Sequence, residues 1–333
     1  MKDGIVNGPR RFDRRHVTAG LAALGIAAPS IVRAQGMFSG KTIRIIIPFV
    51  PGGATDIIGR IMGDKLSQMW GATIIIENKA GAGANLGTDA AAKSAPDGLT
   101  WMVGSVGMAT NPFLYSNLSY DPQKDLDPVT LLAMVPNILV VSKNIKFQSV
   151  SELIAFAKAN PGKLTYGSSG IGTSIHLSGE LFKKLTGTDI VHVPYRGSAA
   201  SLQDLISGQL DLIFDNITSS IEHVRGGSIR AMGITTSTRS PHAPDLAPII
   251  ETVPGFDVSS WFAFFVPAKT PKDMILKIQQ DSKLALADPV VKSRMDAIAA
   301  QIVASTPDEL GAHLRAESDK WGKLIRDGNI KAQ

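Results

Sequence analysis

The chain has 333 residues, of which 44% are hydrophobic, 34 are basic, 29 are acidic and none is Cys. Its length favours two domains that each bury a hydrophobic core. The lack of thiols excludes a disulfide framework, a Cys-ligated metal site and a Cys nucleophile.

The first 35 residues have the pattern of an export signal. Arg10, Arg11, Arg14 and Arg15 precede an apolar stretch at 17–28, and small residues surround Arg33, which predicts cleavage near Ala34. The apolar stretch is far shorter than the ~20 residues that span a bilayer. The run Asp-Arg-Arg-His-Val at 13–17 resembles a twin-arginine signal, with an ordinary Sec signal as the alternative. Either route predicts a periplasmic protein.

Removing this segment changes the charge balance. Six basic and two acidic residues fall within 1–35, so 28 basic and 27 acidic residues remain, a net charge of +1. A nucleic-acid partner is not expected, because such proteins carry a basic surface on their folded part.

The rest of the chain alternates short apolar runs with helical patterns, which predicts an α/β fold with mostly parallel strands. The runs are nearly all apolar, so we expect these strands to be buried on both faces. Strands are predicted at 43–49, 73–77, 99–104, 164–168, 190–194, 210–214 and 229–235, and helices at 55–70, 88–94, 106–115, 150–159, 174–185, 199–207, 219–225, 272–287 and 307–323.

Two long apolar segments, 130–143 and 256–271, bracket the second half of this series. Each contains Pro and suits a strand that crosses between two lobes. We therefore predict lobe 1 at 36–139 and 265–333, with lobe 2 inserted at 140–264 and a two-stranded hinge between them.

The loops that follow the predicted strands are rich in Gly and hydroxyl residues and contain almost no Lys or Arg. They include 51–56, 80–85, 104–107, 168–174 and 215–220. Glycine lets the backbone approach a ligand closely, and the first turn of a helix offers unpaired N–H groups. Since strand ends meet at one edge of a parallel sheet, the five loops predict a site for a small anion held by backbone amides.

Each loop also has a purely structural interpretation. Thr55, Asp56 or Thr173 can cap a helix, and Pro-Gly-Gly at 51–53 can simply make a turn. His192 suits strand packing, whereas His176, if it faces the cleft, is expected to be a neutral donor because the helix field disfavours its protonation.

Signals for catalysis or for a cofactor are weak. The glycines at 81, 83 and 87 miss the dinucleotide fingerprint, no Gly-x-Ser-x-Gly elbow occurs, and the five His beyond residue 35 have no metal-pair spacing. No cofactor and no metal are predicted. The enzyme alternative is an exported enzyme for a small acid with Asp56, His176 or Asp215 as acid or base.

Several segments together resemble the Bug family of periplasmic solute-binding proteins, the receptors of tripartite tricarboxylate transporters. They are IRIIIPFVPGGATDIIGR from 43, IIIENKAGAGANLGTDAAAKSAPDG from 74, the long block YGSSGIGTSIHLSGELFKKLTGTDIVHVPYRGSAASLQDLISGQLDLIFDN from 166 and DKWGKLIRDGNI from 319. The resemblance covers the chain beyond the export signal. It implies a two-lobed type II periplasmic-binding fold, of the Venus flytrap kind, that closes on a small carboxylate.

Matched position by position, the resemblance implies a set of ligand-binding residues. They are Val50, Pro51, Gly52, Gly53, Ala54, Thr55, Asp56, Ala84, Asn85, Ser105, Val106, Gly107, Ser169, Gly170, Ile171, Gly172, Thr173, Ser174, His176, Asp215 and Asn216. Phe49, Val50, Ile171 and Met108 are candidates for the pocket walls. Ala84 replaces a Gly of many relatives, and 244–256 is one residue shorter than the usual pattern.

The resemblance implies a protein that captures a carboxylate and delivers it to integral-membrane transporter subunits. We expect a monomer. A sensor that presents its ligand to a membrane kinase is an alternative. The sequence leaves the ligand open among citrate-like acids, dicarboxylates, aromatic carboxylates and amino acids.

Overall fold

The computed structural model describes residues 1, 4 and 36–332. The predicted export signal and its cleavage point near Ala34 therefore lie outside the described residues. None of the helices described has the length and apolar character needed to cross a membrane.

Strands and helices alternate through the first two thirds of the described chain, and helices dominate the last third. In chain order they are β1 (Thr42–Ile47), α1 (Ala54–Trp70), β2 (Thr73–Asn78), α2 (Asn85–Ala92), β3 (Thr100–Gly104), α3 (Gly107–Leu114), β4 (Leu126–Ser142), α4 (Val150–Ala159), β5 (Thr165–Ser168), α5 (Ser174–Thr186), β6 (Val191–Pro194), α6 (Ser198–Ser207), β7 (Leu212–Asn216), α7 (Ile217–Arg225), β8 (Ile229–Ile234), the 3-10 helix η1 (Ile249–Glu251), β9 (Ser259–Pro267), α8 (Lys272–Ala287), α9 (Pro289–Ala297), β10 (Gln301–Ile302) and α10 (Pro307–Asp327).

The strands hydrogen-bond in the order β2-β1-β3-β9-β4-β7-β5-β6, and β8 and β10 also pair with β4. Two parallel sets, β2-β1-β3 and β6-β5-β7, lie at the two ends of this order. Strands β9 and β4 are antiparallel to their neighbours and join the two sets. The predicted α/β class is confirmed.

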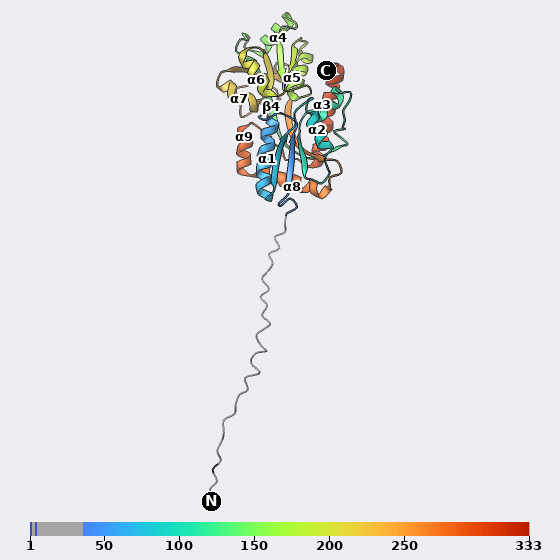
Figure 1. The fold of residues 1–333 in the computed structure, drawn as a ribbon. Coiled ribbons are helices and arrows are strands. Elements are labelled where there is room, and N and C mark those ends of the chain that lie inside the picture. The colour runs from blue at the N-terminus through green and yellow to red at the C-terminus, as the bar shows by residue number, and fades with distance from the viewer. Residues whose placement is uncertain (2–3, 5–35, 333) are drawn as a thin grey trace. The chain divides into compact units, whose positions relative to one another are not determined.

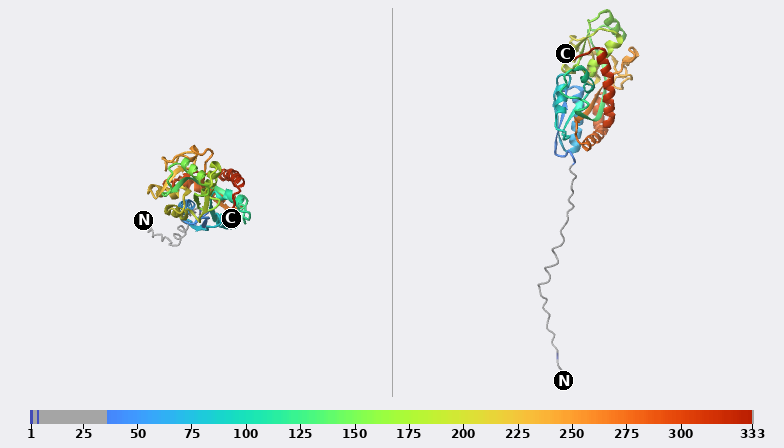
Figure 2. Two further views of the ribbon diagram at one scale, coloured as in Figure 1. Left: turned by 90° about the horizontal axis from the view of Figure 1, so that it is seen from above. Right: turned by 90° about the vertical axis from the view of Figure 1, so that its right-hand side faces the viewer.

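Strand β4 takes part in both halves of the sheet. Its residues 126–136 pair with β9, and its residues 137–142 pair with β7 and β8. Both segments predicted to cross between lobes thus contain strands. In Figure 1 helices α4 to α7 gather at one end of β4, while α1, α8 and α9 lie around the other end. The right-hand view of Figure 2 shows α10 as a long red helix along one side of the body.

The hydrophobic core lies on both faces of the sheet because apolar residues of the central strands point to both faces. Along β1, Ile45 and Ile47 belong to one buried cluster and Ile46 belongs to the other. This alternation follows from the two-residue period of a strand. The expectation of burial on both faces is wrong for β2 and β6, where Ile75 is 50% and Val191 44% exposed, because these two are edge strands.

Local signals fix the helix ends. Helix α1 stops at Gly71, which has a positive φ of 60°, and α10 begins with a capping box between Thr306 and Glu309. The bounds predicted for α4 and α8 match the structure. Helix α9 and strand β10 were not predicted, although Asp288 caps α9 with its side chain and Pro289 occupies its first position.

Candidate functional site

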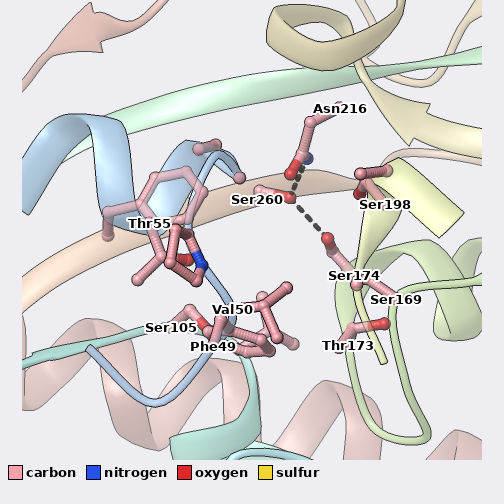
Figure 3. A pocket seen from close by; sticks show the side chains of 17 residues that line it. Phe49, Val50, Thr55, Ser105, Ser169, Thr173, Ser174, Ser198, Asn216 and Ser260 are labelled. Atoms are coloured by element: carbon pink, nitrogen blue, oxygen red, sulfur yellow. Dashed lines mark hydrogen bonds between the residues drawn. The ribbon is translucent and has the colours of Figure 1, made fainter. Parts of the chain in front are cut away.

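A pocket opens where the carboxyl ends of β1, β3, β5 and β7 meet β9. Seventeen residues line it, around about 560 Å³ of space free of protein atoms, part of it open to solvent. They are Phe49, Val50, Pro51, Gly53, Ala54, Thr55, Ser105, Val106, Ser169, Thr173, Ser174, Gly197, Ser198, Ala199, Asn216, Ser260 and Phe262. We call this space the inner pocket. Figure 3 shows Thr55 with the start of α1 on one side and Thr173 and Ser198 on the other.

Five helices begin at the inner pocket. The residues at or next to the first positions of α1, α3, α5, α6 and α7 all contribute to its lining, for example Ala54, Val106, Ser174, Ser198 and Asn216. The first N–H groups of a helix have no partner within the helix, and its N-terminal end carries a partial positive charge. Their convergence makes the pocket suited to an anion.

None of the seventeen lining residues carries a charged side chain. An anion in the inner pocket would therefore be held by backbone N–H groups and hydroxyls. Across the described residues, no cluster of three or more His, Asp or Glu is placed to hold a metal ion.

A buried polar network forms the floor of the inner pocket. The side-chain amide of Asn216 donates to Ser260 Oγ at 2.6 Å, and Ser260 Oγ donates to Asn137 Oδ1 at 3.1 Å. Ser174 Oγ also hydrogen-bonds to Ser260, as drawn in Figure 3. The network joins α5, β7, β4 and β9, so the floor depends on elements from both halves of the sheet.

Asp56 organises the loop between β1 and α1. Its side chain is buried and accepts hydrogen bonds from the Gly52 N–H at 3.0 Å, Arg60 Nε at 2.9 Å and Asn78 Nδ2 at 2.9 Å. Burial alone would raise the pKa of Asp56, but these hydrogen bonds outweigh it and hold the pKa below its usual value. Asp56 therefore shapes the loop and does not line the inner pocket.

His176 has a comparable role in the loop between β5 and α5. It is buried, and its Nδ1 accepts a hydrogen bond from the Gly172 N–H. Its ring lies 4.3 Å from that of His192, whose Nε2 is 2.7 Å from Ser168 Oγ. Burial lowers the pKa of both imidazoles to about 3. The lowered pKa agrees with the neutral state expected for His176. Its ring, however, contacts the Gly172 N–H of the loop and does not line the inner pocket.

Asp215 lies at the end of β7, fully buried behind the inner pocket. Ser220 Oγ donates to its Oδ2 at 2.5 Å, while its Oδ1 is buried without a hydrogen-bond partner. Burial raises the pKa of Asp215 to about 6.

Twelve of the predicted site residues line the inner pocket. They are Phe49, Val50, Pro51, Gly53, Ala54, Thr55, Ser105, Val106, Ser169, Thr173, Ser174 and Asn216. Ala84, Gly170 and Ile171 line an adjoining cavity instead. The remaining predicted positions, Gly52, Asp56, Asn85, Gly107, Gly172, His176 and Asp215, line neither space.

Two of the predicted positions have clear structural tasks. Asn85 Oδ1 accepts hydrogen bonds from Asn111 Nδ2 at 2.7 Å and from the Tyr120 hydroxyl at 2.6 Å. Ala84 has a φ of 77°, a left-handed conformation that glycine adopts at lower cost. Met108, expected in the pocket wall, belongs to the hydrophobic core.

Five lining residues were missed from the sequence: Gly197, Ser198, Ala199, Ser260 and Phe262. The first three lie at the junction between β6 and α6, where Gly197 precedes the first helical residues Ser198 and Ala199. This is the same Gly- and hydroxyl-rich pattern as in the predicted loops, so the sequence did carry a signal for them. Ser260 and Phe262 lie inside the apolar strand β9, where nothing local marks them. Only the position of β9 beside β4 brings them to the pocket.

A family model described as "Tripartite tricarboxylate transporter family receptor" matches residues 58–330. The chain belongs to this family. Its members are solute-binding receptors. The similarity to solved periplasmic binding proteins described below confirms the predicted type II periplasmic-binding fold.

Three solved structures of similar proteins support the assignment to this receptor family. Rpa4515 of R. palustris, solved with adipate, is 35% identical, covers 87% of this chain and 98% of its own, and gives a TM-score of 0.84. The periplasmic binding protein BugD is 29% identical over 89% of this chain and 100% of its own, with a TM-score of 0.84. MatC (Rpa3494) of Rhodopseudomonas palustris, with bound malate, is 30% identical over 86% of this chain and 99% of its own, with a TM-score of 0.81.

Proposed function

We propose that this receptor captures a small carboxylate in the inner pocket and delivers it to the membrane subunits of a tripartite tricarboxylate transporter. The observation that carries the proposal is the convergence of five helix starts on a pocket without charged side chains. Similar receptors were solved with adipate and with malate, both of which are dicarboxylates.

Backbone donors supply enough binding energy for this role. A hydrogen bond to a charged group contributes about 1.5–3 kcal/mol, and micromolar affinity requires about 8 kcal/mol. Several N–H groups and the hydroxyls of Thr55 and Ser169 around one carboxylate therefore suffice without an Arg in the inner pocket.

Capture would proceed by closure of two lobes, with 36–139 and 265–333 as the first and 140–264 as the second. Strand β4 pairs with β9 up to Pro136 and with β7 from Asn137 onward. This change of pairing partner supports a hinge formed by β4 and β9. A carboxylate that touches α1 and α5 at once would favour the closed form by its higher affinity for that form.

The periplasm is the proposed location, after export by a twin-arginine or Sec signal and cleavage near Ala34. A monomer is the proposed state. The function is binding without turnover: the enzyme alternative needs substrate contact by Asp56, His176 or Asp215, and these side chains lie behind the pocket lining.

The test combines thermal-shift and calorimetric titration with product analysis on a panel of dicarboxylates, tricarboxylates, aromatic acids and amino acids. A ligand at a hundred times its Kd should stabilise the protein by about 2.7 kcal/mol, with no product formed. A panel in which no carboxylate shifts the melting temperature, or in which a product accumulates, would contradict the proposal.

Gly53→Val sharpens this test. Gly53 has a φ of −83° and no atom within 4 Å of an added Cβ, so valine strains neither the backbone nor the core and instead projects into the pocket. The variant should melt cooperatively and lose ligand binding. Gly311→Val, on the opposite end of the sequence in α10, is the control and should bind normally.

A further inference from the structure

A second cavity adjoins the inner pocket, and we call it the outer cavity. It encloses about 1380 Å³ of space free of protein atoms, part of it open to solvent. Its lining residues are Pro48, Phe49, Val50, Ala80, Gly81, Ala82, Gly83, Ala84, Leu86, Tyr115, Ser169, Gly170, Ile171, Pro194, Tyr195 and Arg196.

The two spaces are neighbours. Phe49, Val50 and Ser169 line both of them. The peptide that joins Arg196 to Gly197 also connects them, because Gly197 lines the inner pocket and Arg196 the outer cavity. Adjacent Cα atoms are about 3.8 Å apart, so a ligand that fills the inner pocket and extends outward reaches the surroundings of Arg196.

Loops from both halves of the sheet form the wall of the outer cavity. A Cβ atom placed on Gly83 would lie 2.7 Å from the carbonyl oxygen of Ile171, so the loop before α2 touches the loop before α5. Thr110 Oγ1 donates to the Gly172 carbonyl oxygen at 2.9 Å nearby. An extended ligand would therefore be enclosed by both loops along its length.

Arg196 is the only charged side chain that lines either space, and it is exposed. It forms no ion pair or side-chain hydrogen bond with any described residue. The neighbouring Tyr195 hydroxyl donates to Asp204 at 2.6 Å and is thus engaged elsewhere. The guanidinium of Arg196 is therefore available as a donor at the cavity.

We propose that Arg196 binds the second carboxylate of a dicarboxylate whose first carboxylate occupies the inner pocket. This inference rests on the proposed function and names the substrate class: linear dicarboxylates in preference to monocarboxylates. The planar fork of an Arg matches a carboxylate with two parallel N–H···O bonds. The uncharged inner pocket then recognises any carboxylate, and Arg196 supplies the selectivity.

The experiment compares acids that differ only in the second charge. Calorimetric titration of the full protein uses the C4 to C8 linear dicarboxylates, each beside the monomethyl ester of the same acid. The wild type should bind at least one dicarboxylate about tenfold more tightly than its ester, a difference of about 1.4 kcal/mol. Arg196→Gln should remove that preference while the affinity for the ester changes less than about twofold.

Arg315→Gln is the matched control, because it removes the same charge from an exposed position on α10 that lines neither space. It should leave both affinities unchanged. Raising the ionic strength should weaken dicarboxylate binding more in the wild type than in Arg196→Gln, since an exposed ion pair is screened by salt.

The outcomes separate the two proposals. If the wild type binds the acids and their esters equally, or if Arg196→Gln retains the preference, the role of Arg196 is refuted and the proposed function stands. If the wild type binds no carboxylate of this panel or of the wider one, the proposed function itself fails, and this inference fails with it.

Discussion

Nδ1 of His176 accepts a hydrogen bond from the backbone N–H of Gly172, at a distance of 3.2 Å. This bond folds the loop between β5 and α5 back onto the start of α5, where Thr173 and Ser174 line the inner pocket. It requires an unprotonated Nδ1. The shape of the pocket loop therefore depends on a neutral imidazole, kept so by burial.

Acid should destabilise the protein through the two neighbouring imidazoles of His176 and His192. Burial lowers the pKa of His176 and His192 to about 3, whereas an unfolded chain has a His pKa near 6.5. Their stabilising contribution is complete above about pH 6.5 and is lost as the pH falls toward about 3, at up to ~1.4 kcal/mol per pH unit for each imidazole. Urea unfolding at several pH values between 7.5 and 4 measures this effect. The free energy of unfolding should fall less steeply with decreasing pH in His192→Gln than in the wild type. Equal slopes would argue against burial of a neutral His192.

Asp215 should have the opposite pH dependence. Burial raises the pKa of its carboxyl group to about 6, above the unfolded value near 3.8. Its contribution is therefore fully present below about pH 3.8 and is lost as the pH rises through 6. Asp215→Asn should increase the free energy of unfolding at pH 8 by up to about 3 kcal/mol relative to the wild type, and should give no increase at pH 3.5.

Asp319→Asn removes one negative charge from an exposed position and serves as the control for Asp215→Asn. A gain in stability that is the same at both pH values in Asp215→Asn would contradict the burial argument. So would an equal gain in the control.

Removing the Ser260 hydroxyl should destabilise the buried hydrogen-bond network at the floor of the inner pocket. Ser260→Ala leaves Asn216 Nδ2 and Asn137 Oδ1 with one buried partner fewer, which should lower the free energy of unfolding by about 1–3 kcal/mol. Ligand affinity should fall as well, because Ser260 lines the pocket. Chemical denaturation and calorimetry measure the two effects, with Ser151→Ala on the exposed face of α4 as the control. An unchanged stability would show that the network is dispensable.

The hydrogen bond from Thr110 Oγ1 to the Gly172 carbonyl oxygen should favour the closed form. Thr110→Val keeps the side-chain shape and removes about 0.5–1.5 kcal/mol from that form. Carboxylate affinity should fall about two- to tenfold, and the ligand-free protein should show a larger radius of gyration in solution scattering. Thr73→Val, at an exposed position of β2, should change neither quantity. If Thr110→Val changes neither the affinity nor the radius of gyration, this hydrogen bond does not stabilise the closed form.

The local elements could be predicted from the sequence because their signals are local. The spacing of Ile58, Ile61, Met62 and Leu66 identifies the buried face of α1, and Gly71 marks its end. Helices α4 and α8 begin and end where the sequence predicts. Helix α9 was missed even though it carries a side-chain cap, because its nine residues bury only Val291 and Met295.

The sequence by itself determined the α/β class, the Gly-rich loops after the strands and the presence of amide donors at the starts of α1, α3, α5 and α7, because each follows from residues close together along the chain. Only the tertiary structure decided which side chains face the ligand space. It brought Ser260 and Phe262 from inside an apolar strand to the inner pocket, and it turned Asp56, His176 and Asp215 away from the lining. Such choices depend on strand pairing and burial between distant segments, which a local pattern does not encode.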